Sequence, residues 1–142
     1  MKIALNGFGR IGRNILRSYI QNEDKALQIV AINDLAITST NAHLLKYDSI
    51  HGTLRDEITH NDSSIFVKNS EIKCFSEKNP ENLPWKQMGI DLVFECTGLF
   101  TSKEKANSHL KAGAKRVIIS APGNDAVSYT HLPSPRDAQL SR

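Results

Sequence analysis

The sequence has few of the features that mark secreted, membrane-bound or metal-binding proteins. Its 142 residues include only two cysteines, Cys74 and Cys96. Such a pair suggests neither a disulfide framework nor a metal site, which needs more ligands at closer spacing. No apolar run approaches the roughly 20 residues that cross a bilayer, and the segment Met1–Gly7 is too poor in apolar residues for a signal peptide. We therefore expect a reducing, cytoplasmic compartment and no membrane partner.

Strong charge of either sign is also missing. Lysine and arginine total 18 against 15 aspartates and glutamates, a formal net charge of +3, and no block of like charges stands out. This balance gives no reason to expect a nucleic-acid partner. With 39% hydrophobic and 23% charged residues, the composition is that of an ordinary globular domain, and the chain is long enough for one core.

Apolar segments of strand and helix type alternate along most of the chain. Short apolar or β-branched runs predict buried strands at Lys2–Asn6, Leu27–Asn33, Ile90–Glu95 and Lys115–Ser120. Apolar spacing and caps predict helices at Arg10–Gln21, at about Ser39–Tyr47 and from the capping box of Thr101 and Glu104 to Gly113. Strands that alternate with helices pair in parallel through right-handed crossovers.

Three segments depart from this alternation. The stretch His51–Cys74 has short strand-like pieces broken by turn residues, which predicts one or two antiparallel hairpins. Ser76–Gly89 is polar and contains two prolines, so we expect mostly loop. Val127–Arg142 is polar and turn-rich without a period, and we interpret it as an unrelated or disordered tail. The strand Lys115–Ser120 would then leave an exposed sheet edge that promotes aggregation.

A glycine-rich turn is the first motif that indicates a ligand-binding site. Gly7, Gly9 and Gly12 form a G-x-G-x-x-G pattern between the first strand and the first helix. The first glycine permits a tight turn, the second lets a pyrophosphate approach the backbone, and the third lets the helix pack closely. The N–H groups of Arg10 and Ile11 would meet the phosphates at the positive end of the helix dipole.

An acidic residue follows at the spacing that this pattern requires. Asp34 ends the second strand, 22 residues after Gly12, and dinucleotide sites have an acid about 20 residues on. Its carboxylate can accept hydrogen bonds from ribose hydroxyls and would repel a 2′-phosphate, which favours NAD over NADP. The alternative is a plain tight turn with Asp34 as a cap. We predict an α/β fold with a Rossmann-type doubly wound, mostly parallel sheet, incomplete at its C-terminal end, with a small antiparallel hairpin insertion.

Two hydroxyl residues follow later strands. Thr97, with Gly98 behind it, and Ser120 come after the third and fourth predicted strands, at the edge where ligands of parallel sheets bind. Spacing alone leaves open whether they contact a cofactor or are only loop and cap hydroxyls. Cys96 at the same edge is interpreted as a small buried apolar residue rather than a nucleophile. The histidines lack metal-ligand spacing, so neither a metal site nor a catalytic residue is assigned.

Taken together, these motifs resemble the phosphorylating glyceraldehyde-3-phosphate dehydrogenases (type I). The resemblance covers about residues 1–126 and rests on five stretches in the family order: Asn6–Arg13, Ala31–Asp34, Leu44–Ser49 with His51-Gly52, Glu95–Phe100 and Ser120–Pro122. It implies that residues 1–126 are a truncated NAD-binding Rossmann domain and that residues 127–142 are a separate tail.

The resemblance also assigns cofactor contacts, residue by residue. Arg10 and Ile11 would contact the pyrophosphate of NAD, and Asp34 would hold the adenosine ribose. Lys78 stands where the family commonly has arginine, with its backbone beside the adenine. The remaining positions implied to border the cofactor are Asn6, Gly7, Gly9, Gly12, Thr97, Gly98 and Ser120, the last towards the nicotinamide.

The family's reaction implies what a longer protein would do. Glyceraldehyde 3-phosphate adds to a cysteine thiolate, the hemithioacetal passes a hydride to NAD, and inorganic phosphate releases 1,3-bisphosphoglycerate, a step of glycolysis, with a histidine as base. Full-length members are usually homotetramers. The nucleophile lies in a Ser-Cys-Thr-Thr-Asn motif that this sequence lacks, so we expect the 142-residue chain to be catalytically inactive.

Several alternatives stay open at this point. Erythrose-4-phosphate dehydrogenase shares the same opening motifs, and a non-enzymatic dinucleotide-binding fragment is a different class of protein altogether. The tail also has an alternative origin. Val127–Leu132 can be back-translated into an adapter used in DNA-library preparation, which gives the hypothesis that the tail is translated technical sequence. Genomic DNA that continues normally across this junction would contradict that hypothesis.

Overall fold

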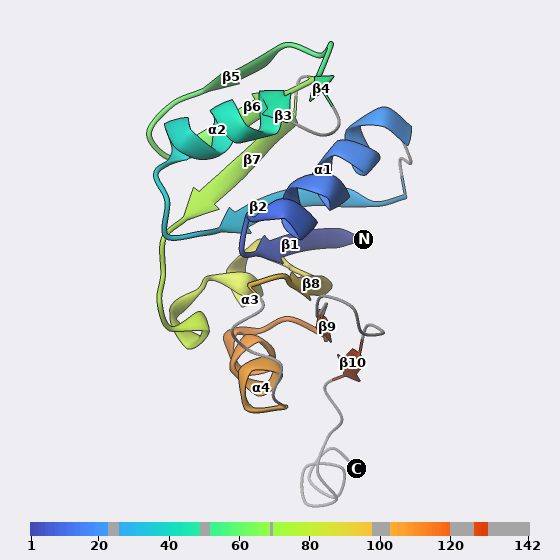
Figure 1. Ribbon diagram of the computed structural model, residues 1–142. Coiled ribbons are helices and arrows are strands. Elements are labelled where there is room, and N and C mark those ends of the chain that lie inside the picture. The colour runs from blue at the N-terminus through green and yellow to red at the C-terminus, as the bar shows by residue number, and fades with distance from the viewer. Residues whose placement is uncertain (23–25, 49–51, 69, 98–102, 120–126, 131–142) are drawn as a thin grey trace, which may run out of the picture.

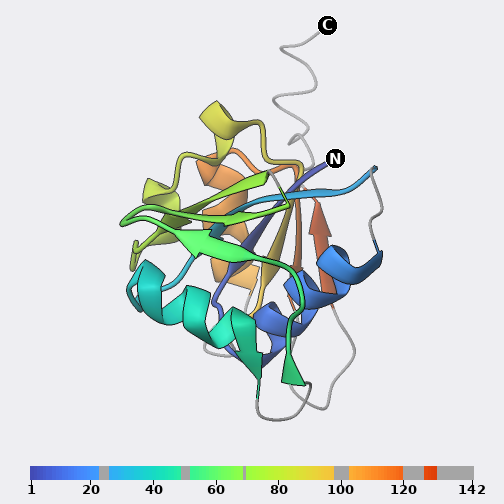
Figure 2. The same cartoon turned by 90° about the horizontal axis from the view of Figure 1, so that it is seen from above.

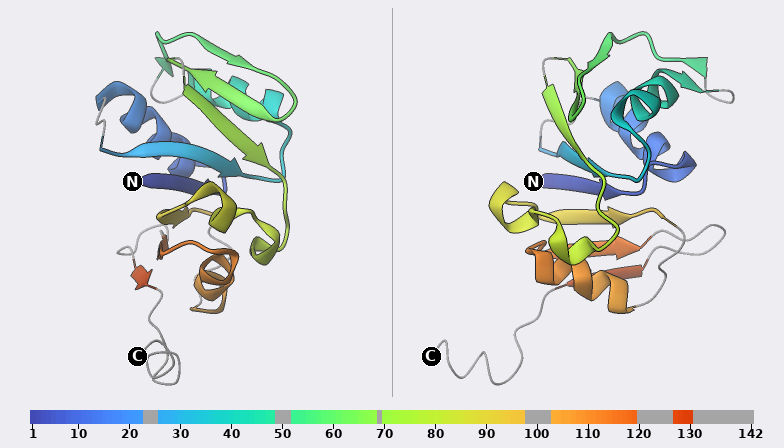
Figure 3. Two further views of the ribbon diagram at one scale, coloured as in Figure 1. Left: turned by 180° about the vertical axis from the view of Figure 1, so that it is seen from behind. Right: turned by 90° about the vertical axis from the view of Figure 1, so that its left-hand side faces the viewer.

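One mixed β-sheet organises the molecule. The computed structural model describes residues 1–22, 26–48, 52–68, 70–97, 103–119 and 127–130. Eight strands form the sheet in the order β10-β9-β8-β1-β2-β7-β6-β5, which can be followed from one edge to the other in Figure 3. Their bounds are β1 Lys2–Asn6, β2 Gln28–Asn33, β5 Ile58–His60, β6 Ser64–Val67, β7 Ser70–Phe75, β8 Leu92–Glu95, β9 Arg116–Ile119 and β10 Val127–Thr130.

The remaining elements are mainly helices. They are α1 Arg10–Asn22, α2 Thr38–Lys46, the 3₁₀ helix η1 Pro80–Asn82, α3 Trp85–Met88 and α4 Lys103–Ala112, with a two-stranded ribbon of β3 Tyr47–Asp48 and β4 Gly52–Thr53 (Figure 1). The predicted end of the last helix at Gly113 is confirmed by the positive φ of that glycine, +118°. Thr101 of the predicted capping box lies outside the described residues. No helix within the described ranges is long and apolar enough to cross a membrane.

The five central strands, β9, β8, β1, β2 and β7, all run parallel. The chain first adds β2 on one side of β1 and later returns to add β8 on the other side. The strand order therefore reverses beside β1, and ligands of open parallel sheets bind at such a switch point. The predicted Rossmann-type fold is confirmed.

Side-chain alternation in β1 gives the sheet two buried faces. Ile3 and Leu5 pack in the cluster that contains Leu16 of α1, whereas Ala4 belongs to the opposite cluster with Trp85 of α3. Helices α1 and α2 thus cover one face of the sheet, and α3 and α4 cover the other (Figure 2). Alternate residues of a strand point to opposite faces, so a near-continuous apolar strand is required where both faces are covered.

A buried arginine joins α1 to the end of α2. Arg17 is only 4% exposed. Its guanidinium donates hydrogen bonds of 3.1, 3.0 and 2.6 Å to the backbone carbonyls of Leu45, Lys46 and Gly52. The last carbonyls of a helix have no partner within the helix, so a cation placed there satisfies them and complements the helix dipole. Arg17 therefore closes the C-terminal end of α2.

The predicted hairpin insertion is part of the main sheet. Strands β5, β6 and β7 pair antiparallel, as the turn residues indicate. However, β7 also pairs in parallel with β2. The insertion therefore extends the parallel sheet and carries the chain back to the carboxyl ends of β2 and β1.

The stretch expected to be mostly loop contains two short helical segments. Pro80 occupies the first turn of η1, where the side chain of Asn79 accepts a hydrogen bond from the Glu81 N–H at 3.1 Å. Pro84 is the N-cap residue of α3. Proline suits the start of a helix, because its missing N–H group would have no helical partner there. The prolines that indicated loop therefore begin helical turns.

The expected disordered tail begins with a strand. Val127–Thr130 forms β10, which pairs antiparallel with β9 over its four residues. The expectation of irregular chain is wrong for these residues, and so is the expectation of an unpaired β9 edge. Valine, tyrosine and threonine suit a strand, and the edge of β9 offers unpaired N–H and C=O groups. Residues 131–142 lie outside the described part, so the domain boundary at residue 126 stays a prediction.

Candidate dinucleotide-binding site

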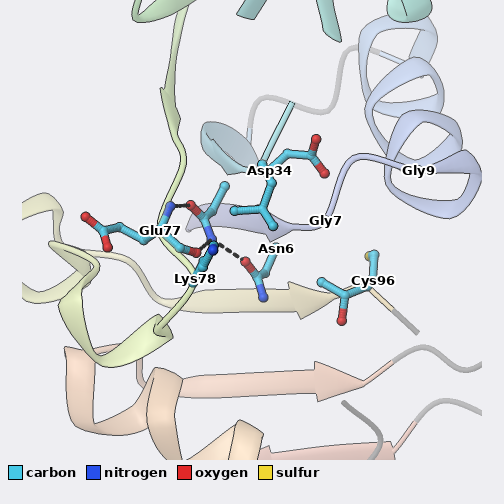
Figure 4. A pocket seen from close by; sticks show the side chains of 10 residues that line it. Asn6, Gly7, Gly9, Asp34, Glu77, Lys78 and Cys96 are labelled. Atoms are coloured by element: carbon cyan, nitrogen blue, oxygen red, sulfur yellow. Dashed lines mark hydrogen bonds between the residues drawn. The ribbon is translucent and has the colours of Figure 1, made fainter. Parts of the chain in front are cut away.

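A cavity of about 500 Å³ opens beyond the carboxyl ends of β1, β2 and β8 (Figure 4). It lies at the switch point of the sheet, and its volume is within the range of small-molecule sites. Six of the residues predicted from the sequence line it: Asn6, Gly7, Gly9, Asp34, Lys78 and Thr97. Sequence reasoning did not assign four other lining residues to the site: Asn33, Leu35, Glu77 and Cys96.

Glycine is required at the turn between β1 and α1. Gly7 has a φ of +92°, and a Cβ atom there would lie 2.9 Å from the backbone nitrogen of Thr97. A Cβ on Gly12 would overlap the carbonyl oxygen of Gly7, so α1 packs directly on the turn. A Cβ on Gly9 would meet nothing within 4 Å. The space above Gly9 is thus open to a ligand group, as a pyrophosphate requires.

The predicted phosphate contacts lie at the start of α1, next to this open space. Arg10 and Ile11 are the first two residues of the helix and do not line the cavity with their side chains. The first bond into the helix runs from the Arg13 N–H to the carbonyl of Gly9 at 2.9 Å. The N–H groups before it have no partner within the helix, and such groups bind anions. The residues present therefore fit a pyrophosphate.

The carboxylate of Asp34 connects the second strand to the glycine turn. Its Oδ1 accepts a hydrogen bond from the Phe8 N–H at 2.9 Å, and its Oδ2 accepts one from the Ala36 N–H at 3.0 Å. Asp34 therefore caps the backbone of the turns at Phe8 and Ala36, which is the alternative role that the sequence left open. Each carboxylate oxygen can accept a further hydrogen bond, so the cap is compatible with the predicted ribose contact.

A row of polar side chains crosses the ends of β2, β1 and β8. Asn6 is in register with Asn33 on one side and with Glu95 on the other. The amide nitrogen of Asn33 donates to Oδ1 of Asn6 at 2.7 Å, and the amide nitrogen of Asn6 donates to Oε1 of Glu95 at 2.6 Å. All three side chains are buried. The row fixes the lateral positions of the three strand ends that frame the cavity.

The segment that follows β7 is held against the cavity by the same row. The side chain of Asn33 accepts from the Glu77 N–H at 2.8 Å and donates to the Glu77 carbonyl at 2.9 Å. This two-point contact imitates strand pairing and fixes the backbone that leads to Lys78. The position of Lys78 in the cavity wall therefore depends on an asparagine that precedes Asp34 by one residue.

Thr97 is held by the carboxylate at the end of β8. Oε2 of Glu95 accepts hydrogen bonds from the backbone N–H and the hydroxyl of Thr97 at 3.1 and 2.8 Å. Burial raises the pKa of Glu95, but hydrogen bonds from His109 and Asn6 outweigh burial, and the pKa lies below its ordinary value. Glu95 is therefore ionised at neutral pH. Gly98, which follows Thr97, and Ser120 lie outside the described residues, and their predicted roles stay predictions.

Neither cysteine has the environment of a nucleophile. Cys96 is 7% exposed, and burial together with the charge of Glu95 raises the pKa of its thiol to about 12. Burial also raises the pKa of Cys74, which is partly buried. Thiols act as nucleophiles through the thiolate, so both are unreactive at neutral pH. Among the residues that the structure describes, no three histidine, cysteine or acidic side chains could hold a metal ion.

We expect Cys96 of the folded chain to resist alkylation at pH 7. A pKa of about 12 in place of the ordinary 9.0 lowers the thiolate fraction, and we expect iodoacetamide to react at least about a hundredfold more slowly than with the denatured chain. Mass spectrometry of peptides after timed labelling measures both rates. Equal rates in the folded and denatured chains would contradict the buried, protonated thiol.

These features define a Rossmann-type dinucleotide-binding domain. They are the parallel sheet with its switch point, the glycine turn at the start of α1, and Asp34 at the end of the second strand. Residues 1–103 match the family model described as "Glyceraldehyde 3-phosphate dehydrogenase, NAD binding domain". The chain belongs to the glyceraldehyde 3-phosphate dehydrogenase family, of which it carries the NAD-binding domain. The predicted family and the predicted cofactor, NAD, are confirmed.

Individual relatives agree with the family model. The chain is 51% identical over 131 residues to the plasmid-encoded glyceraldehyde-3-phosphate dehydrogenase of Cupriavidus necator, which covers 92% of this chain and 39% of the relative. It is 52% identical over 126 residues to the enzyme of Pseudomonas aeruginosa, covering 88% of this chain and 38% of the relative. The chain thus spans less than two fifths of the length of these curated relatives.

Proposed function

We propose that this chain is the NAD-binding part of a phosphorylating glyceraldehyde-3-phosphate dehydrogenase. The whole protein would oxidise glyceraldehyde 3-phosphate to 1,3-bisphosphoglycerate in glycolysis. The observation that carries this proposal is the cavity at the switch point, framed by the glycine turn and Asp34. Because both cysteines of the chain are protonated at neutral pH, we expect the 142-residue chain to bind NAD without turnover.

Different residues at the cavity would contact different parts of NAD. When bound, NAD supplies the hydride acceptor of the reaction. The pyrophosphate would lie over Gly9 and accept hydrogen bonds from the N–H groups of Arg10 and Ile11. Asp34 would accept hydrogen bonds from the adenosine ribose, and the backbone at Lys78 would lie beside the adenine.

The other cofactor contacts come from the ends of β8 and β9. Thr97 and Gly98 would border the middle of the cofactor, and Ser120 would lie towards the nicotinamide. For the whole protein we further propose a cytoplasmic location, a phosphorylated aldehyde as substrate and assembly as a homotetramer.

Calorimetric titration of the unmodified chain with NAD tests the proposal directly. We expect one NAD per chain and no production of NADH when glyceraldehyde 3-phosphate and phosphate are added. Absence of binding at millimolar NAD would contradict the proposal, and phosphate-dependent NADH production would contradict the expected lack of turnover.

Replacing Asp34 with asparagine is expected to weaken the preference for NAD over NADP. The amide can still accept from Phe8 or Ala36, but it no longer carries the charge that repels a 2′-phosphate. We expect the ratio of the two dissociation constants to fall about tenfold, equivalent to about 1.4 kcal/mol. Titration with both cofactors measures this ratio. Asp62→Asn is the matched control, because Asp62 is exposed and does not line the cavity. An unchanged ratio would show that Asp34 does not determine the preference for NAD over NADP.

A further inference from the structure

Three residues form hydrogen bonds with the carboxylate of Glu95 at the end of β8. Its Oε1 accepts from Asn6 at 2.6 Å and lies 2.9 Å from Nε2 of His109, while its Oε2 accepts twice from Thr97. Glu95 is 1% exposed and His109 is 0% exposed. Two of these partners, Asn6 and Thr97, line the cavity, whereas His109 lies behind it on α4.

The proton on His109 is fixed by its other neighbour. Nε1 of Trp85 lies 3.1 Å from Nδ1 of His109. Because an indole nitrogen can only donate, Nδ1 must accept, and the proton of the neutral imidazole therefore lies on Nε2. This tautomer makes His109 a donor to Glu95. A line of hydrogen bonds thus runs in one direction, from Trp85 through His109 to Glu95.

No neutral group of the same shape could take the place of this carboxylate. Four donors converge on it: the side chains of Asn6 and His109, and the N–H and hydroxyl of Thr97. The two oxygens of an ionised carboxylate have about four acceptor positions. The amide of a glutamine would direct its own N–H groups at the Thr97 N–H in one orientation, and at the donors of Asn6 and His109 in the other. Burying an anion is costly, and a complete set of donors offsets that cost and holds the carboxylate in one position.

We propose that Glu95 is the positioning residue of the NAD site, and that His109 acts through it to set Asn6 and Thr97 at the cavity wall. This inference rests on the proposed function, because it concerns the affinity of the same site. Glu95 itself does not line the cavity. Its effect on NAD passes through the two residues that it holds.

A pair of substitutions at His109 separates positioning from simple packing. Glutamine can place an N–H donor near the position of Nε2, whereas leucine cannot donate but suits the apolar surroundings of a buried site. We expect His109→Leu to weaken NAD binding at least about tenfold, and His109→Gln to restore most of the affinity. If His109 served only the core, leucine would bind NAD as well as glutamine does or better, and that result would overturn the inference.

Substitution of Glu95 itself gives a second test. Glu95→Gln keeps the shape and removes the charge, and we expect it to increase the hydrogen exchange rate of the Thr97 amide at least tenfold and to weaken NAD binding. Val93→Ala is the control, because Val93 is buried on the same strand and the same face of the sheet and has no polar contact with Glu95. We expect that control to lower the melting temperature and to leave the Thr97 amide and NAD affinity unchanged.

The two readouts distinguish failure of this inference from failure of the proposed function. If the unmodified chain does not bind NAD, the proposed function fails, and the exchange rate of Thr97 in Glu95→Gln still decides whether the carboxylate positions that residue. If the unmodified chain binds NAD but Glu95→Gln leaves both the exchange rate and the affinity unchanged, the inference is wrong and the proposed function stands. Faster exchange with weaker binding supports both.

Discussion

Replacing Arg17 with methionine is expected to lower the free energy of unfolding by about 3 kcal/mol. Methionine can fill much of the buried volume, but it removes the hydrogen bonds to the carbonyls of Leu45, Lys46 and Gly52. The Lys46 carbonyl keeps its other donor, the N–H of Leu54 at 2.9 Å. Leaving a buried carbonyl such as that of Leu45 unpaired costs more than the hydrogen bond gains, since its contact with water has already been lost. The end of α2 and the ribbon that follows it should loosen first.

Urea denaturation followed by the fluorescence of the single tryptophan measures this loss. Arg17→Lys should be intermediate, because an ammonium group carries the charge but cannot reach three carbonyls in a fixed fork. Gln21→Met on the exposed side of the same helix is the matched control, with an expected change within about 0.5 kcal/mol. Equal effects at positions 17 and 21 would show that the three hydrogen bonds do not stabilise the fold.

Replacing Gly7 with alanine is expected to reduce both stability and NAD affinity. The left-handed backbone at φ +92° strains any residue with a Cβ, and that atom would also approach within 2.9 Å of Thr97. The ends of β1 and β8 would have to separate, and the cavity opens just beyond them. We expect a loss of about 3 kcal/mol in unfolding free energy and at least a tenfold loss in NAD affinity.

A second glycine separates crowding from backbone strain in this experiment. Gly89 has a φ of +68°, but a Cβ there would meet nothing within 4 Å. Gly89→Ala should therefore cost only about 1 kcal/mol, the conformational part alone, and leave NAD affinity unchanged. If both variants lost the same stability and both retained NAD, close approach of the strand ends would not explain the glycine at position 7.

Local patterns in the sequence predict the scaffold of the site well. The bounds of β1 agree with the predicted strand Lys2–Asn6, and α1 begins at the predicted Arg10. Such elements follow from apolar periodicity and from the glycine turn between them, which are properties of neighbouring residues. Asp34 lines the cavity as expected, because the carboxyl ends of parallel strands meet at one edge of the sheet.

Features that depend on distant residues could not be predicted. The pairing of Asn33 with the backbone of Glu77 joins positions 44 residues apart, and neither residue has a local signature. His109 had no assigned partner, because its contact with Trp85 requires α3 and α4 to pack on the same face. Likewise, β10 is a strand only because the edge of β9 is available to it.

The row of side chains at the cavity also implies an order of assembly for the domain. The link from Asn33 to Asn6 spans 27 residues, whereas the link from Asn6 to Glu95 spans 89. Closing the longer loop costs more chain entropy, and contacts of long sequence separation form slowly. During synthesis the glycine turn and Asp34 can meet while β8 is still missing. The half of the site that we propose for the adenosine would therefore exist before the half that contains Thr97, and the cofactor would bind most tightly only after the last parallel strands dock.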